Sequence, residues 1–316
     1  MKFRPDDCRR AYQDDGFVVV PELLEPTLLA RLREGMDGVT GKLDDLKPHL
    51  REKIFLERDH VRNNPRWYAG TLTPEQCGAS VRQIADLALF GPAFAEILCH
   101  PPLLDVLQAL FESPEFSFSL LVGRPKAARV GNGVRDGKFH RDSPTDPVTS
   151  PNTIIAILCL DDMGAANGGT AFIRGSHKVP DEEAVRPCWN EVDPGQFRPE
   201  ERVVVSCTAG SGLFFSSKTL HAAGHNRSDV PRRTLLSEWA GPGVLPTSPE
   251  RHAYQGLKPR SQDPACQKQM RLTFPQFVAG GDQPSPRPNP HKAFRVKRHY
   301  FPGPGTMRRV LPRAPG

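Results

Sequence analysis

The spacing of hydrophobic and polar residues changes near residue 115, and the two parts of the pattern predict different elements. Before that point, apolar residues recur at the intervals of one helix face. The clearest run contains Leu28, Leu29, Leu32 and Met36. A second helical block is expected at 77–111, with breaks at Gly91 and at the prolines 101–102. Apart from a short β-branched run at 17–20, residues 1–114 are therefore expected to be mostly helical.

From about Glu115 onward, the apolar runs become short and are separated by Gly, Pro, Asn and Asp. Eight such runs lie at 116–123, 126–131, 137–142, 152–160, 170–175, 202–207, 212–217 and 232–239. Many short strands divided by turn residues are typical of an antiparallel barrel or jelly roll. The predicted fold class is therefore α+β and mainly β, with a jelly-roll core and flanking N-terminal helices.

One domain is expected over residues 1–240, with a helical part at 1–114 and the jelly-roll core at 115–240. The remaining residues, 241–316, are rich in proline and basic side chains. Such a composition predicts an extension that packs on the core or trails from it.

The loop 178–201 separates two of the predicted strands and is rich in charge and proline. It is longer than a plain strand connection needs to be. Because long loops at a barrel mouth often carry function, this loop is a candidate lid over the substrate.

Composition and charge narrow the function further. With 38% hydrophobic and 25% charged residues the chain is typical of soluble globular proteins. No apolar run was expected to span a bilayer, which takes about 20 residues, and the charged start predicts a cytoplasmic location. The net charge of +6 permits contact with nucleic acid, but the basic excess lies mainly in the last stretch. No nucleic-acid or membrane partner is therefore expected, and the seven scattered cysteines are expected to be reduced.

The stretch KFHRDSP places His140 and Asp142 two residues apart, with Arg141 between them. On a β-strand, the period of two directs both side chains to the same face. An imidazole and a carboxylate on one face form either a hydrogen-bonded surface pair or two-thirds of a metal site.

A third ligand is available downstream, at His221 or His225. The two are four residues apart, as in a helical zinc protease, but that motif needs a glutamate where this chain has Ala222. A strand, a turn and a strand is the better interpretation of the segment. Two imidazoles and one carboxylate make the facial triad of non-haem Fe(II) oxygenases, with positions left open for a co-substrate and dioxygen.

Three blocks in order carry a resemblance to a known family: HRD at 140–142, NGGTAFIRGSHK at 167–178 and HAAGHNRSDVPRR at 221–233. Together with the opening YQDDGFVVVPELL, they resemble the phytanoyl-CoA dioxygenase family of Fe(II)/2-oxoglutarate oxygenases over residues 10–240. The resemblance implies a double-stranded β-helix core of the jelly-roll, cupin-like type. It also implies Fe(II), with 2-oxoglutarate and O2 as co-substrates and ascorbate as an activator in vitro.

The family pattern HxxGxN…R falls on His221, Gly224, Asn226 and Arg232. This selects His221 over His225 as the third metal ligand. Arg232 follows His221 by eleven residues, the family's spacing for the arginine that holds the distal carboxylate of 2-oxoglutarate. Strand alternation directs Arg232 to one face and Arg233 to the other. A buried guanidinium without a nearby acid suits a carboxylate, which it binds through two hydrogen bonds.

Other contacts follow from the resemblance with less support from the residues themselves. Thr170 and Lys126 are expected to contact the co-substrate, and Arg141 the substrate. His177 is expected to cap a turn rather than bind metal. Arg124, Lys126 and Arg141 crowd the metal-bearing strands, which predicts a substrate with an acidic group.

Two departures from the family pattern leave part of the binding site open. Ala223 stands where a serine is common, and Leu158 or a neighbour stands where an aromatic often lines the site.

The resulting functional prediction is a dioxygenase that hydroxylates an unactivated C–H bond of a small or medium polar metabolite and releases succinate and CO2. Specialised metabolism is one expected setting, and desaturation, epoxidation or cyclisation use the same chemistry. Asp142 excludes halogenation, because related halogenases carry a small residue there. The alternatives are a non-catalytic metal-binding jelly roll, as a sensor or scaffold, and a basic nucleic-acid-associated protein. The partner is a small molecule, and the chain is expected to be a monomer or homodimer.

Overall fold

The computed structural model describes residues 4–65, 72–130, 139–143, 152–180, 197–244 and 252–275. The α-helices are α1 (Pro5–Asp15), α2 (Pro26–Gly41), α3 (Pro48–Arg51), α4 (Glu57–Asn63), α6 (Pro74–Cys77), α7 (Pro92–Glu96), α8 (Pro101–Phe111) and α10 (Pro264–Thr273). Short 3-10 helices are η1 (Leu43–Asp45), η2 (Leu87–Phe90), η3 (Ile97–Cys99), η4 (Ser176–Lys178) and η6 (Pro199–Glu201). The strands are β1 (Phe17–Val20), β2 (Ile54–Leu56), β3 (Val81–Ile84), β4 (Ser117–Lys126), β5 (Thr153–Cys159), β6 (Thr170–Ile173), β7 (Arg202–Val204), β8 (Gly212–Ser216), β9 (His221–Ala223) and β10 (Arg232–Ala240).

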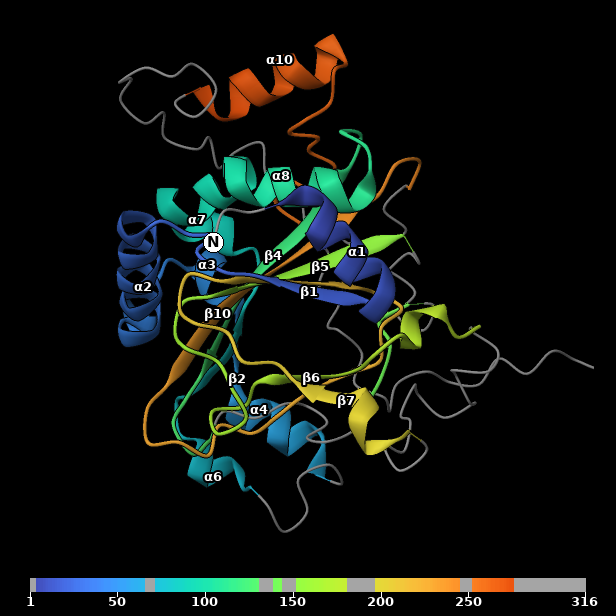
Figure 1. The fold of residues 1–316 in the computed structure, drawn as a ribbon. Helices are drawn as coiled ribbons and strands as arrows, with labels where there is room; N and C mark the ends of the chain where they lie inside the picture. Colours follow the sequence, from blue (N-terminus) through green and yellow to red (C-terminus); the bar gives the residue numbers. More distant parts are fainter. Residues whose placement is uncertain are drawn as a thin grey trace, which may run out of the picture.

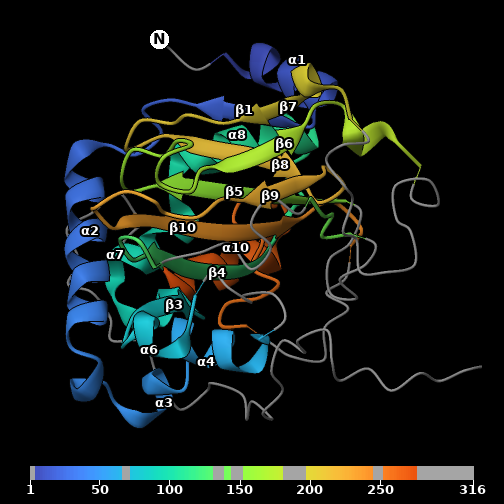
Figure 2. The same ribbon diagram turned by 90° about the horizontal axis from the view of Figure 1, so that it is seen from below.

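A seven-stranded sheet forms the larger layer, in the order β1-β8-β5-β10-β4-β3-β2, and its neighbouring strands run antiparallel. Figure 2 shows these strands side by side across the molecule. In its centre, Thr234 of β10 lies opposite Cys159 of β5 and Arg124 of β4. Residues that pair across strands project to the same face, so these three side chains share one side of the sheet.

The smaller sheet has the order β7-β6-β9 and lies across from the large sheet, as Figure 1 shows for β6 and β7. An apolar cluster joins the two layers: Phe17, Ile155, Ile157, Cys159, Met163, Phe172, Val205, Cys207, Leu213 and Phe215. We call the face of the large sheet that bears this cluster the inner face. Two antiparallel sheets around such a core, with helices outside, confirm the predicted jelly-roll class.

Helices cover the opposite, outer face of the large sheet (Figure 1). In α2 the residues Leu28, Leu32, Met36 and Val39 are buried, which confirms the helical spacing of this run. Proline occupies the first turn of α1, α2, α7 and α8, where its missing N–H costs no hydrogen bond. α1 ends at Gly16, whose φ of 85° suits glycine and whose N–H donates to the Tyr12 carbonyl.

Parts of the secondary-structure prediction were wrong. Residues 81–84, placed in a helical block, form β3, and residues 54–56 form its partner β2. Together with β1, the N-terminal part of the chain therefore contributes three strands to the large sheet. Within the predicted run at 126–131, β4 ends at Lys126 and residues 127–130 are not strand. Runs of three or four residues carry too little periodicity to be distinguished from helix ends.

The stretch Pro92–Phe111 is 20 residues long and apolar enough to cross a membrane by length and composition. The expectation that no segment approaches that length was therefore wrong. In the structure this stretch is divided among α7, η3 and α8, and half of it is buried. Its leucines belong to an apolar cluster between the outer face of the large sheet and the helices, here called the outer apolar cluster, and this packing accounts for their apolar character.

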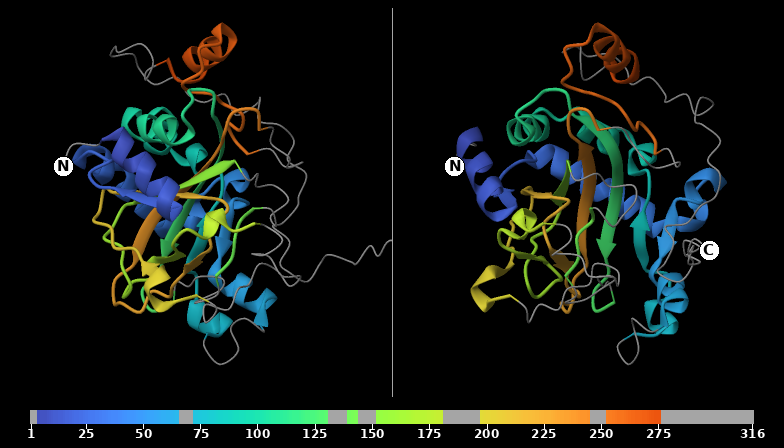
Figure 3. Two further views of the ribbon diagram at one scale, coloured as in Figure 1. Left: turned by 45° about the vertical axis from the view of Figure 1, so that its right-hand side comes forward. Right: turned by 90° about the vertical axis from the view of Figure 1, so that its right-hand side faces the viewer.

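Residues 252–275 pack on the helical side of the core. Leu257, Met270 and Phe274 join the outer apolar cluster. The backbone N–H of Phe118 donates to the Leu257 carbonyl at 2.8 Å, and the N–H of Gly256 donates to the Phe118 carbonyl at 2.8 Å. Figure 3 shows α10 at the outside of the helical layer. Residues 181–196 of the predicted lid and the proline-rich stretch 282–290 lie outside the described residues.

Candidate metal centre and co-substrate arginine

The backbone of β9 positions the His140 segment. His140 and His221 form a bridge of two N–H···O=C hydrogen bonds, each 2.9 Å long. Beyond it the chain bends, and the N–H groups of Asp142 and Ser143 both donate to the Ser217 carbonyl at 3.1 Å. The segment is thus a bridge followed by a bend, where a regular strand was expected.

Three side chains converge at this bend. Nε2 of His140 lies 3.8 Å from Oδ1 of Asp142, and Nε2 of His221 lies 3.8 Å from Oδ2 of the same carboxylate. One ligand atom from each residue lies within 4.8 Å of the other two. The alternative of an isolated surface pair therefore does not describe the arrangement, because the structure adds a third potential ligand from a distant strand.

The surroundings of His221 prepare its Nε2 atom for a metal. Its Nδ1 lies 3.0 Å from the Thr219 carbonyl, which can only accept a hydrogen bond. Nδ1 therefore carries the proton, and the lone pair is on Nε2, which faces Asp142. The Phe215 ring lies 4.8 Å from the His221 ring and forms an apolar wall. Two neutral nitrogens and one carboxylate are a donor set that fits non-haem Fe(II).

Arg232 lies on the inner face and is 5% exposed. Its Nε donates to the Asn167 carbonyl at 3.1 Å, and its Nη2 to the Gly168 carbonyl at 3.2 Å. Among the residues that the structure describes, it has no ion pair with a carboxylate. Burial lowers the pKa of the guanidinium, because the barrel interior solvates its charge poorly.

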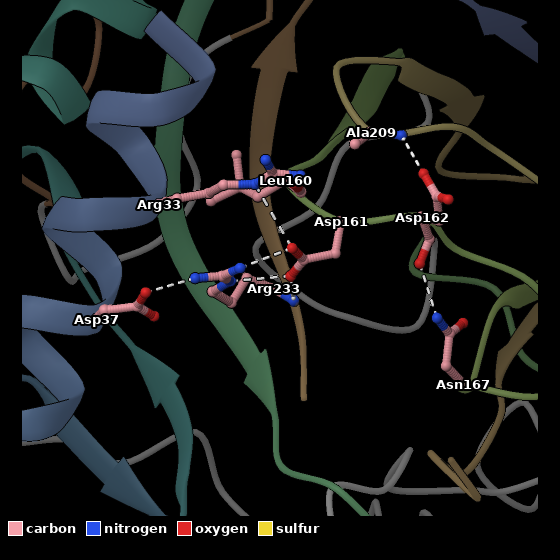
Figure 4. Close-up of polar contacts among 8 residues, drawn as sticks. All are labelled: Arg33, Asp37, Leu160, Asp161, Asp162, Asn167, Ala209 and Arg233. Atoms are coloured by element: carbon pink, nitrogen blue, oxygen red, sulfur yellow. Dashed lines mark hydrogen bonds and ion pairs between the residues drawn. The ribbon is translucent and has the colours of Figure 1, made fainter. Parts of the chain in front are cut away.

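Arg233 projects to the outer face and has the opposite surroundings. Its Nη2 and Nε donate to the two oxygens of Asp161 at 2.7 and 2.9 Å, and its Nη1 donates to Asp37 of α2 at 2.6 Å (Figure 4). These hydrogen bonds raise the pKa of Arg233 above its ordinary value. The inward and outward assignment of the two arginines agrees with the burial along β10.

The turn after β5 supplies the carbonyls around Arg232. The Asp162 carboxylate accepts from the Ala209 N–H at 2.8 Å, and its carbonyl accepts from the Asn167 side chain at 2.7 Å (Figure 4). Gly168 has a φ of 80°, and a Cβ there would lie 2.4 Å from the Gly224 carbonyl oxygen. This agrees with the turn expected at 167–169.

Thr170 and Lys126 occupy different parts of the site. Thr170 is buried at the start of β6, opposite Ala223 and on the face of the small sheet that carries His221 and Phe172. Its expected contact with the co-substrate stays a prediction. The ammonium group of Lys126 donates to the carbonyls of Gly168 and Gly224, so part of its hydrogen-bonding capacity holds the two turns together.

Arg141 is 1% exposed, and its guanidinium donates to the carbonyls of Ser176 and Val179. These contacts hold the GSHK turn, and the expected contact of Arg141 with substrate stays a prediction. His177 packs near Gly16 and its Nε2 lies 3.1 Å from the Gln13 carbonyl, which agrees with a structural role.

Where an aromatic often lines the site, Leu158 or a neighbour was expected. The neighbours Ile157 and Cys159 face inward, and Leu158 belongs to the apolar cluster on the outer face. The buried ion pair of Glu57 with Arg82, at 3.1 Å, was not foreseen. The two residues are 25 apart in the chain, and no motif links them.

With this geometry in place, the comparisons identify the family. The family model for phytanoyl-CoA dioxygenase (PhyH) matches residues 12–234. The chain belongs to the phytanoyl-CoA dioxygenase family. It is therefore a 2-oxoglutarate-dependent non-haem iron dioxygenase, with iron as its metal and 2-oxoglutarate as its co-substrate. The resemblance of the three sequence blocks is confirmed.

Curated relatives of this family include fungal enzymes. The dioxygenase aneA of Aspergillus aculeatus is 27% identical over 233 residues, which is 71% of this chain and 68% of aneA. The Fe(II)/2-oxoglutarate-dependent dioxygenase nvfF of Aspergillus novofumigatus is 25% identical over 243 residues, 74% of this chain and 70% of nvfF.

Solved structures show the same fold. The epimerase SnoN has a TM-score of 0.56 at 20% identity, covering 80% of this chain and 94% of SnoN. EctD from S. alaskensis has a TM-score of 0.56 at 18% identity, covering 74% of each chain. Both likenesses support the jelly-roll fold.

Proposed function

We propose that this dioxygenase hydroxylates an unactivated C–H bond of a small or medium polar metabolite. His140, Asp142 and His221 hold the iron in this proposal, and Arg232 pairs with the distal carboxylate of 2-oxoglutarate. The observation that carries the proposal is the convergence of these three ligand atoms within 4.8 Å, together with a buried arginine on the inner face of the large sheet.

The chain's part in the reaction is to hold and orient. The Thr219 carbonyl fixes the His221 ring, and the hydrogen bonds to Ser217 fix the bend at Asp142, so the ligand set is arranged before metal arrives. Phe172 and Phe215 exclude water from one side of His221. When bound, the iron and 2-oxoglutarate supply the oxidation of the C–H bond, with succinate and CO2 as the other products.

Arg232 gives the co-substrate its direction. Its Nη1 lies 3.5 Å from the Thr234 hydroxyl and 3.4 Å from the Met163 sulfur, so it faces the interior between β10 and the 163–169 turn. A carboxylate paired there would be desolvated and held by charge-assisted hydrogen bonds. This would leave the keto-acid end of 2-oxoglutarate free to point along the inner face.

The neighbours show how broad the outcome can be. SnoN is an epimerase solved with Fe3+ and alpha-ketoglutarate, SnoK is a carbocyclase, and several fungal relatives are named multifunctional dioxygenases. Hydroxylation is proposed as the default for this chain, with specialised metabolism as its setting. Activation by ascorbate, a cytoplasmic location and a monomeric or homodimeric state stay predictions.

The proposal is tested by incubating the protein with Fe(II), 2-oxoglutarate, ascorbate and pools of candidate metabolites, followed by mass spectrometry. A substrate that gains one oxygen in step with succinate supports it. Loss of two hydrogens identifies a desaturase or cyclase. Metal binding without any 2-oxoglutarate consumption would favour the non-catalytic jelly roll instead.

A further inference from the structure

Three cations project from the inner face of the large sheet, where β4 ends and β10 begins: Arg124, Lys126 and Arg232. In the register of β4 and β10, Lys126 lies opposite Arg232, and Arg124 lies opposite Thr234. Gly123, directly before Arg124 in β4, faces the outer side, where a Cβ would meet Met36 of α2. The alternation of β4 therefore directs Arg124 and Lys126 to the interior.

Two of these cations have backbone partners. Lys126 donates to the carbonyls of Gly168 and Gly224, and Arg232 donates to those of Asn167 and Gly168. Arg124 differs from them. Within the described part of the chain, its guanidinium has neither a hydrogen bond nor an ion pair.

The acids near Arg124 act on it only from a distance. Glu57, Asp142 and Glu238 each favour its charged form, but the Glu57 carboxylate is paired with Arg82 at 3.1 Å. This buried pair, 8% and 3% exposed, also holds Arg82 where its charge acts on Arg124. Burial first, and then the charge of Arg82, lower the pKa of Arg124 to about 10, so it stays protonated at neutral pH without a partner.

A partly buried cation without a partner is costly, and a functional site is where that cost is retained. Bound Fe(II) with Asp142 and bound 2-oxoglutarate with Arg232 would offset each other in charge, so neither would compensate the charge of Arg124. Arg124 pairs with Thr234, the next residue of β10 after Arg232 on the same face, and the charge of Asp142 acts on it.

We propose that Arg124 binds a carboxylate of the substrate and so selects carboxylic acids. The inference rests on the proposed function. The sequence attributed the preference for an acidic substrate to Arg124, Lys126 and Arg141 together, and the inference assigns it to Arg124. The planar guanidinium suits a carboxylate through two parallel hydrogen bonds. The acid would lie on the inner face, with the rest of the substrate extending toward the iron ligands.

The test uses three carboxylic acids, hexanoic acid, 3-phenylpropanoic acid and N-acetylphenylalanine, each beside its methyl ester. Formation of succinate above the substrate-free rate is measured with Fe(II) and 2-oxoglutarate. We expect at least one acid to stimulate about tenfold more than its ester, since a charge-assisted pair is worth about 1.5–3 kcal/mol. Arg124→Met should reduce this ratio to about one and raise the KM for the acid about tenfold. Arg124→Lys should recover part of the preference, because it keeps the charge and loses the fork.

Arg129→Met is the matched control. Arg129 lies five residues further along, is 69% exposed and pairs with Asp229, so its loss changes the net charge equally and should leave the acid-to-ester ratio as it was. The KM for 2-oxoglutarate should change less than about twofold in Arg124→Met.

The inference is overturned if no acid stimulates more than its ester, including the case in which neither stimulates. It is also overturned if Arg124→Met leaves the ratio intact, or if that variant raises the KM for 2-oxoglutarate instead. Failure of the proposed function is seen separately, as the absence of any iron-dependent consumption of 2-oxoglutarate by the unmodified protein.

Discussion

The adjacent arginines Arg232 and Arg233 lie on opposite faces of the large sheet and have different partners. On the outer face, Arg233 meets the carboxylates of Asp161 and Asp37, and it ties β10 to α2 (Figure 4). On the inner face, Arg232 and Arg124 have no carboxylate partner among the described residues. A cation paired with acids serves the fold, whereas a buried cation facing only carbonyls retains charge for an anionic ligand.

The largest effect is expected at the metal centre, which gives the inner face its chemistry. Asp142→Ala and His221→Ala should lower iron-dependent consumption of 2-oxoglutarate by about a hundredfold or more, because each removes one of three ligands. His225→Ala is the control and should retain most activity, since His225 lies outside the ligand cluster. Turnover in Asp142→Ala equal to that of the unmodified protein would refute the assigned ligands.

The two arginines should separate by their effect on the co-substrate. Arg232→Met should raise the KM for 2-oxoglutarate at least about tenfold, since a charge-assisted pair contributes about 1.5–3 kcal/mol. Arg233→Met should change it less than about twofold. Initial rates of succinate formation over a range of 2-oxoglutarate concentrations provide the measurement. Equal shifts in the two variants would show that the two faces do not differ in this way.

The same two substitutions should affect stability in the opposite order, with the larger loss in Arg233→Met. Arg233→Met should lower the free energy of unfolding by about 2 kcal/mol, because it leaves Asp161 without its two-pronged partner. Arg232→Met should be close to neutral without ligand, since it removes a buried charge that has no acidic partner. Urea denaturation in the absence of metal and 2-oxoglutarate measures both. A larger loss in Arg232→Met would contradict the distinction.

A smaller effect on stability is expected at low pH, through the buried carboxyl group of Asp86. Burial raises the pKa of Asp86, but hydrogen bonds from His252 and Lys53 outweigh it and lower the pKa to about 2. The carboxylate therefore contributes stability that is fully present above about pH 4 and is lost as the pH falls toward 2. We expect about 1–2 kcal/mol from this group.

Asp86→Asn is suited to test this effect, because asparagine tolerates the φ of 49° at this position. The free energy of unfolding, measured by denaturation between about pH 2 and pH 6, should then have a smaller slope against pH than in the unmodified protein. An unchanged slope would mean that other acids produce the acid sensitivity.

The sequence allowed the main elements of the site to be predicted, for identifiable reasons. Strand alternation separated Arg232 from Arg233, and the spacing within the HxxGxN…R pattern singled out His221. The same alternation does not show where a neighbouring loop turns. The carbonyls that engage Lys126 and Arg141 come from such loops, so the sequence could not distinguish these cations from Arg124.

Short elements and single-residue registers were also beyond sequence reasoning. The strand at 81–84 is too brief to show a period, and its sequence alone predicts part of a helical block. At β5, a shift of one residue moves a side chain to the opposite face. The sequence therefore assigns the inner position only to Leu158 or a neighbour, and in the structure Ile157 and Cys159 hold it.

The central claim is that the inner face holds one iron at His140, Asp142 and His221 and directs 2-oxoglutarate to Arg232. An anaerobic titration tests it most directly, by following the visible charge-transfer absorption of the Fe(II)–2-oxoglutarate complex. The unmodified protein and Arg233→Met should reach saturation at similar concentrations of 2-oxoglutarate, with one iron per chain. Arg232→Met should need about tenfold more, and Asp142→Ala should show no absorption. Undiminished absorption in Asp142→Ala, or identical titrations of the two arginine variants, would contradict the account.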